Sequence, residues 1–269
     1  MRKYHGTLIH RAQDHHGIIE IVDDGFTRSL HFGNAVRQSS MDMNRPEYLV
    51  LAYTRAMMCG LLFQRFPHNV LLIGLGGGSL VKFLLHHFPD CVIDAVEHRE
   101  LVAKLAYGFF MLPEDPRLRV HIADGSGFVR QQELIPSRRY DLILVDAYDD
   151  AGMDDNMGQT QFLNACHSLL TEEGLLAINL WGRDRSNYRL ARRALQKCFS
   201  AKPLFLPSEG TTNVIAIALR RVGHKHLLKS AETRAKPLQT QTGVEFVRLA
   251  RILRNHNGSL VDRFLSQVY

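Results

Sequence analysis

The sequence predicts an α/β fold in which a mostly parallel sheet carries helices on both faces. Three apolar segments support this prediction, because each ends in residues typical of a ligand-binding strand end. The first ends in the glycine-rich turn 74–78, the second ends at Glu97, and the third ends at Asp146. Ligands bind at the carboxyl ends of the strands in open α/β sheets, so these three positions mark the predicted site.

The turn at residues 74–78, GLGGG, follows an apolar strand and precedes a helix expected from Ser79 to Phe88. Glycines let the backbone approach a ligand closely, and the free amides at the start of the helix favour anionic groups. Glu97 follows Gly78 by nineteen residues, at the end of the next strand, where an acid reaches ribose hydroxyls. An ordinary glycine turn is the alternative, but the flanking strand and helix favour a Rossmann-like nucleotide site.

Residues 1–45 predict a small N-terminal β region. Short β-type runs at 7–9, 17–22 and 29–32 are separated by turn signals, which is typical of antiparallel strands. We interpret this region as a lid. From Pro46, which suits a first helical turn, the sequence as far as Phe66 predicts one long apolar helix.

Residues 46–220 predict the cofactor-binding domain itself. Its strands are expected near residues 70–74, 92–96, 118–122, 141–146, 175–179, 201–206 and 213–219, with helices between them. Seven strands of which the last is antiparallel resemble the sheet of the methyltransferase-type Rossmann-like fold.

Residues 221–269 predict a basic helical tail. From residue 220 onward there are ten Lys and Arg residues against three Asp and Glu, while the whole chain has a net charge of +6. Residues 244–255 carry apolar side chains on one face and arginines on another, which predicts an amphipathic helix. We favour a docked helix over a nucleic-acid surface, because no aromatic stacking pattern accompanies the arginines. Residues 225–241 are interpreted as a linker.

Length and composition limit the class of protein that this sequence can form. A chain of 269 residues with 45% apolar content buries one doubly wound core with appendages. No window of about twenty apolar residues predicts a membrane span, and the first residues lack the apolar core of a signal peptide, so we expect a cytoplasmic protein. The four cysteines form no Cys-x-x-Cys pair and the histidines no metal-binding spacing, so no metal is expected.

Four motifs together resemble the spermidine synthase family of polyamine aminopropyltransferases, which is built on the S-adenosylmethionine-dependent methyltransferase fold. They are VLLIGLGGG at 70–78, AVE at 95–97, ADG at 123–125 and YDLILVDAYD at 140–149. The resemblance runs from about Gly17 to Leu219. It implies a homodimer that transfers an aminopropyl group from decarboxylated S-adenosylmethionine to a small polyamine such as putrescine.

The resemblance also implies roles for individual residues. Asp146 is the base that deprotonates the attacking amine, since a protonated amine cannot attack the carbon next to a sulfonium. On the donor side, Glu97 binds the ribose and Asp124 the adenine amino group. The full set of implied donor contacts is Gln38, Gly74, Gly76, Gly78, Glu97, Asp124 and Gly125.

On the acceptor side the resemblance implies that Asp149 holds the polyamine. Residues 146–155 contain five aspartates; they attract a multiply charged cation, or they form a solvated acidic loop. Tyr48 is what remains of a family tripeptide, Tyr-His-Glu or Tyr-Gln-Glu. Trp181 follows the fifth strand of the domain, either as a wall of the acceptor pocket or as a packing residue.

Three departures from the family keep other functions open. Gly77 replaces an aspartate of the family's glycine loop, the tripeptide is Tyr48-Leu49-Val50, and the family's DSSDP is DAYDD at 146–150. A loop without an acid admits the carboxylate of intact S-adenosylmethionine, which favours a methyltransferase as the alternative. A non-catalytic binding or interaction module is the third hypothesis. The retained Glu97, Asp124 and Asp146 argue against this third hypothesis. We expect aminopropyl transfer, because the resemblance covers most of the chain.

Overall fold

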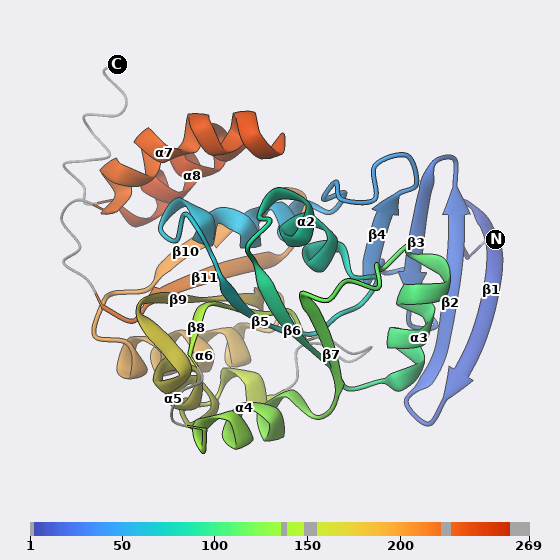
Figure 1. The fold of residues 1–269 in the computed structure, drawn as a ribbon, viewed down its shortest axis with the longest axis horizontal. Coiled ribbons are helices and arrows are strands. Elements are labelled where there is room, and N and C mark those ends of the chain that lie inside the picture. The colour runs from blue at the N-terminus through green and yellow to red at the C-terminus, as the bar shows by residue number, and fades with distance from the viewer. Residues whose placement is uncertain (1–2, 136–138, 148–154, 222–226, 259–269) are drawn as a thin grey trace.

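The computed structural model describes residues 3–135, 139–147, 155–221 and 227–258 (Figure 1). Two sheets organise this part of the chain, one with four strands and one with seven. Among the described residues no helix combines the length and apolar character needed to cross a membrane.

The N-terminal sheet is antiparallel, with the order β1-β2-β3-β4. Its strands are β1 Thr7–Asp14, β2 Gly17–Asp24, β3 Thr27–His31 and β4 Ser39–Asp42. One face packs on helix α3 (Glu100–Phe109) through a cluster in which Ile21 and Leu30 meet Val102 and Leu105. Figure 1 shows this sheet at one end of the molecule, beside α3.

The large sheet has the order β10-β11-β9-β8-β5-β6-β7. The strands are β5 Asn69–Ile73, β6 Val92–Glu97, β7 Leu118–Ile122, β8 Tyr140–Val145, β9 Leu170–Trp181, β10 Leu204–Pro207 and β11 Asn213–Leu219. Strands β5 to β9 run parallel, and β11 inserts antiparallel between β9 and β10. The predicted seven-stranded sheet with an antiparallel last strand is therefore confirmed, although β10 begins at Leu204 and not at residue 201.

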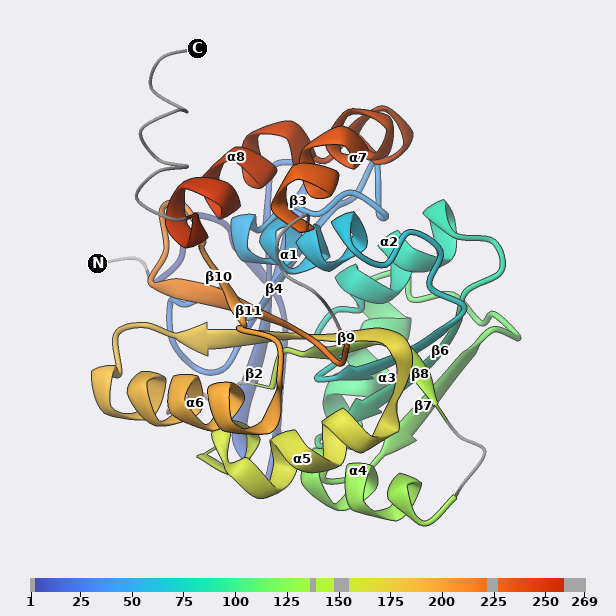
Figure 2. The same ribbon diagram turned by 90° about the vertical axis from the view of Figure 1, so that its left-hand side faces the viewer.

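Helices cover both faces of this sheet because its central strands are apolar on both sides. Val70 and Leu72 of β5 pack in a cluster with the helices α1, α2, α7 and α8, while Leu71 and Ile73 pack with α4, α5 and α6. Figure 2 shows the two layers above and below the strands. The helices are α1 Ala52–Met57, α2 Ser79–His87, α4 Gly125–Glu133, α5 Thr160–Leu169, α6 Arg185–Cys198, α7 Leu227–Thr242 and α8 Phe246–Asn257.

The long helix predicted from Pro46 to Phe66 is wrong in length. Only α1 and the 3₁₀-helix η1, Met58–Leu62, are helical. The residues before them are held by β4, since Leu49 forms an antiparallel bridge with Met41. Within η1, a Cβ on Gly60 would lie 2.9 Å from Leu175 of β9, so the helix passes very close to the sheet at this point.

The linker predicted at residues 225–241 is also wrong, because α7 occupies most of it and contains Pro237. Ala231 and Ala235 are buried against the core, and Arg234 donates to the backbone oxygens of Leu62 and Phe63 at 3.1 and 3.2 Å. This packing stabilises a helix that composition alone disfavours. The apolar face predicted for the next helix is buried in α8, as a docked helix requires.

Candidate active site

The carboxyl ends of β5 and β8 are in direct contact. The Asp146 N–H donates to the Ile73 oxygen at 2.8 Å, and the Gly74 N–H donates to the Val96 oxygen at 2.9 Å. Gly74 has a φ of +93°, and a Cβ there would lie 2.2 Å from the backbone oxygen of Asp146. Glycine is therefore required at residue 74, where the turn after β5 passes the backbone of Asp146, the predicted catalytic residue.

Glu97 lies under the glycine-rich turn. Its Oε2 accepts hydrogen bonds from the N–H groups of Leu75 and Gly76 at 3.1 and 3.4 Å, and its Oε1 accepts one from the Arg99 N–H at 2.9 Å. A carboxylate offers about four acceptor positions, so Glu97 retains capacity for a ligand hydroxyl. Gly76 and Gly78 both have positive φ values, +53° and +70°.

Asp124 caps helix α4. Its Oδ2 accepts the Gly127 N–H at 2.6 Å, and the residue is exposed, which leaves Oδ1 for a ligand. Gly125 lies against the sheet, since a Cβ there would come within 2.5 Å of the Ile73 side chain. The glycine-rich turn is thus surrounded by three parts of the fold, which are the end of β5, the end of β6 and the start of α4.

Asp146 is only partly exposed, and its side chain is hydrogen-bonded by residues of two elements, β9 and α1. Asn179 of β9 donates from Nδ2 to Oδ1 at 2.9 Å, and Asn179 itself accepts from Asn213 of β11 at 2.9 Å. Burial raises the pKa of Asp146 to about 6, while hydrogen bonds from Asn179 and the Tyr53 hydroxyl act in the opposite direction. The carboxylate is therefore oriented, and it is more basic than an ordinary aspartate.

Tyr53 connects Asp146 to the N-terminal region. Its hydroxyl also lies 3.3 Å from the backbone oxygen of Gln38, the residue that precedes β4. Sequence analysis missed Tyr53 because it lies inside an apolar run. It also missed Asn179, although a single polar residue near the carboxyl end of a buried strand indicates a position at the candidate site.

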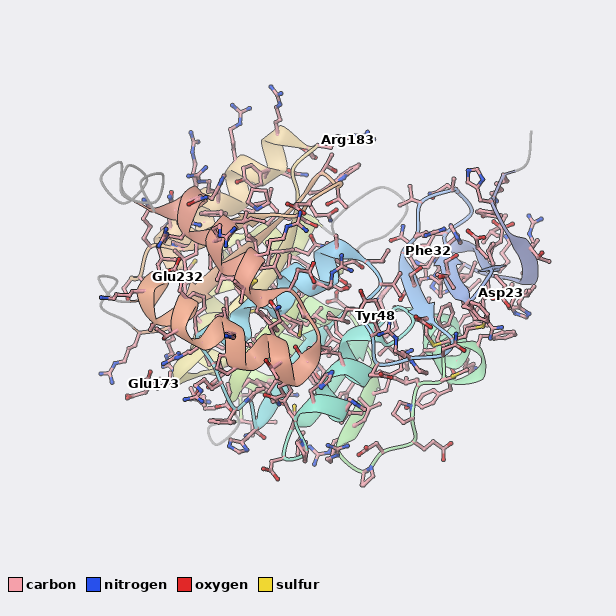
Figure 3. The ribbon with its side chains drawn as sticks, turned by 90° about the horizontal axis from the view of Figure 1, so that it is seen from above. Asp23, Phe32, Tyr48, Glu173, Arg183 and Glu232 are labelled. Carbon is pink, nitrogen blue, oxygen red and sulfur yellow. The ribbon has the colours of Figure 1, made fainter. Side chains whose placement is uncertain are left out.

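The structure describes two of the three residues predicted to bind the acceptor. Tyr48 lies in the connection between β4 and α1 (Figure 3), where the guanidinium of Arg45 stacks 4.4 Å from its ring centre. The tyrosine bonded to Asp146 is Tyr53, so Tyr48 is not the tyrosine of this network. Trp181 is the last residue of β9 and pairs with Asn213. Asp149 lies outside the described residues.

Gly77 is fixed by its surroundings. A Cβ at this position would lie 2.8 Å from both the Phe110 ring and the Ser39 Oγ. Beneath it, the buried Lys82 donates from Nζ to the Gly77 oxygen at 3.1 Å, and also to the Phe110 oxygen. Burial lowers the pKa of Lys82 to about 8. A side chain at residue 77 would therefore require Phe110 or Ser39 to shift, and the Lys82 ammonium lies against the turn.

No cluster of metal-ligating side chains is found within the described ranges. The site consists of a glycine-rich turn, the carboxylates of Glu97 and Asp124 beside it, and a third carboxylate held by an asparagine and a tyrosine. Such an arrangement suits group transfer that is assisted by a base.

Comparison with known proteins assigns the chain to a family. The family model for the spermine/spermidine synthase domain matches residues 51–180. The polyamine aminopropyltransferase of Chromobacterium violaceum is 34% identical over 248 residues, which is 92% of this chain and 93% of that protein. The chain belongs to the spermine/spermidine synthase family.

Solved structures agree with the fold. Spermidine synthase from Thermotoga maritima superposes with a TM-score of 0.73 over 97% of this chain and 86% of that chain, at 16% identity. Human methyltransferase-like protein 13 in complex with SAH superposes with a TM-score of 0.61 over 81% of this chain and 99% of that chain, at 26% identity. The predicted methyltransferase-type fold of this spermidine synthase family member is thus confirmed.

Proposed function

We propose that the protein is an aminopropyltransferase, which moves the aminopropyl group of decarboxylated S-adenosylmethionine to an amine of a small polyamine such as putrescine. Membership of the spermine/spermidine synthase family supports this function. The single structural observation that carries it is the carboxylate of Asp146, held by Asn179 and Tyr53 at the carboxyl end of β8.

Asp146 acts in this proposal as the general base. Aliphatic ammonium groups have pKa values of about 10, so an acceptor must lose a proton before it attacks. The pKa of Asp146, about 6, is roughly four units below the pKa of such an ammonium group. The pKa of an ordinary aspartate is more than about six units below it. Desolvation of the bound amine narrows the remaining difference. Asn179 and Tyr53 use two of the roughly four acceptor positions of the carboxylate, which leaves positions for the amine.

The residues around the glycine-rich turn fit an adenosine group. Glu97 has acceptor capacity left for a ribose hydroxyl, and Asp124 has an oxygen available for an adenine amino group. Gly76, at a φ of +53°, adds no side chain to the turn. When bound, the donor supplies an electrophilic carbon next to its sulfonium. The chain's part is to hold the nucleoside, to align the acceptor and to accept a proton at Asp146.

Turnover with defined substrates tests the proposal. We expect purified protein with decarboxylated S-adenosylmethionine and putrescine to release methylthioadenosine and spermidine, detected by liquid chromatography and mass spectrometry. Asp146→Asn should abolish both products. Asp141→Asn should retain them, since Asp141 lies at the opposite end of β8 and binds the His68 and Asn69 amides. Methylated product from intact S-adenosylmethionine, with no spermidine, would replace the proposal by methyl transfer.

The proposal extends to assembly and compartment. Family resemblance implies that the protein functions as a homodimer in the cytoplasm. Light scattering coupled to size-exclusion chromatography tests the dimer, and a monomeric mass at micromolar concentration would contradict it.

A further inference from the structure

Helix α6 has one buried face and one strongly basic face. Ala191, Ala194 and Leu195 are buried in the core cluster that includes α5 and β9. The opposite face carries Arg185, Arg189, Arg193 and Lys197, all of them exposed.

These four residues recur at every fourth position and form a stripe along the helix, here called the α6 stripe. At 1.5 Å per residue the stripe is about 18 Å long, with a cation about every 6 Å. Arg183 lies just before the helix and is also exposed. Figure 3 labels Arg183 and shows nitrogen-tipped side chains projecting outward along this edge of the molecule.

No carboxylate in the described part of the chain pairs with the α6 stripe, whereas several other surface arginines are paired. The exposed Arg221 is paired with Glu172, and the exposed Arg248 is paired with Glu209. Within α6, the Arg189 Nε donates to the backbone oxygen of Arg185 at 3.0 Å, which leaves the outer guanidinium nitrogens facing solvent.

The acid closest in sequence to the stripe, Asp184, is engaged by the backbone. Its Oδ1 caps α6 by accepting the N–H groups of Ser186 and Asn187 at 3.0 and 3.1 Å. Like charges four residues apart destabilise a helix, and Arg185 lies at the helix end where a cation is unfavourable. Among the described residues nothing compensates this unfavourable arrangement, as is expected of a surface that receives an external anion.

We propose that the α6 stripe binds the phosphate backbone of single-stranded nucleic acid. Arginine recognises phosphate through paired hydrogen bonds. A line of cations with regular spacing suits a flexible strand of phosphates, which can follow the helix axis. This binding goes beyond the proposed aminopropyl transfer and does not depend on it, because phosphate contacts along α6 require neither Asp146 nor the glycine-rich turn.

Fluorescence anisotropy with a labelled single-stranded RNA of mixed sequence, about 20 nucleotides long, tests the proposal across 25 to 200 mM salt. The variant R185Q/R189Q/R193Q removes three potential phosphate contacts. Each contact with a single strand contributes about 0.7 to the slope of log affinity against log salt concentration. We therefore expect this variant to lower the slope by about 2 and to weaken binding most at low salt.

The matched control is R65Q/R130Q/R251Q, which removes the same charge from exposed arginines away from α6. Circular dichroism verifies that both variants are folded. The control should change the slope by less than about half as much as the stripe variant. The proposal is overturned if the unmodified protein does not bind RNA at 25 mM salt, if both variants lose affinity equally, or if polyglutamate of similar length competes as well as unlabelled RNA. None of these readouts requires turnover, so failure here is distinct from failure of the proposed aminopropyl transfer.

Discussion

Asp146→Asn tests the environment of the proposed base. The pKa of Asp146 rises from 3.8 to about 6, because burial disfavours the charged form and the bonds from Asn179 and Tyr53 offset this only in part. Each pKa unit corresponds to roughly 1.4 kcal/mol, so ionisation costs the folded state at most about 3 kcal/mol. Because the residue is partly exposed, solvent screening reduces this cost. We expect Asp146→Asn to stabilise the protein by about 1 to 2 kcal/mol at pH 8.

The stabilisation expected from Asp146→Asn depends on pH. Below pH 3.8 the carboxyl is protonated in both the folded and the unfolded protein, so its ionisation carries no penalty. The penalty grows as the pH rises from 3.8 to about 6 and is complete above that value. The stabilisation by Asp146→Asn is therefore full at pH 8 and falls to about half of that at pH 5.

Thermal unfolding at these two pH values measures the effect. A domain of this size gains about 2 to 4 °C in Tm per kcal/mol, so Asp146→Asn should raise Tm by about 2 to 8 °C at pH 8. Asp141→Asn is the control on the same strand. It should lower Tm, since the Asp141 carboxylate accepts the His68 and Asn69 amides at 2.9 and 3.0 Å. A lower Tm for Asp146→Asn at pH 8, or a gain at pH 5 as large as at pH 8, would refute the reasoning.

Three further substitutions test the neighbouring contacts. Tyr53→Phe removes a hydrogen bond that lowers the pKa of Asp146, so the acidic limb of the kcat/KM profile should move to higher pH; an unchanged limb would contradict the contact. Gly77→Asp should destabilise the protein by about 1 to 3 kcal/mol in urea unfolding, because its Cβ would lie 2.8 Å from the Phe110 ring, and adding Phe110→Leu should recover part of that loss. Gly74→Ala, at a φ of +93° and against Asp146, should lose both stability and turnover, and full retention of either would contradict the geometry.

The sequence predicts the sheet well because its local signals agree with one another. Buried parallel strands are continuous apolar runs, and the glycine-rich turn after Ile73 and the acids Glu97 and Asp146 mark where three of them end. The pattern that identifies the strands thereby also identifies the edge at which the candidate site lies.

The partners of Asp146 were not predictable in the same way, because they depend on strand order and register. Val145 of β8 pairs with Ile178 of β9, so the next residue of β9, Asn179, lies beside Asp146. Nothing local to Asn179 indicates that pairing. Helix α7 was missed for a related reason: its polar composition and Pro237 disfavour a helix, and only its contacts with distant segments stabilise it.

The N-terminal sheet belongs to the site in physical terms, although sequence analysis interprets it as a separate lid. The Arg99 amide holds Glu97 Oε1, while its guanidinium binds both carboxylate oxygens of Asp14 in the β1–β2 hairpin, at 3.0 and 2.7 Å. On the other side, the Ser79 hydroxyl at the start of α2 donates to the Ser40 oxygen of β4 at 3.1 Å. The residues that frame the glycine-rich turn are therefore bonded to two strands of the N-terminal sheet. We expect a ligand that orders Glu97 and the turn to favour the docked position of that sheet as well, because Arg99 binds Glu97 through its amide and Asp14 through its guanidinium.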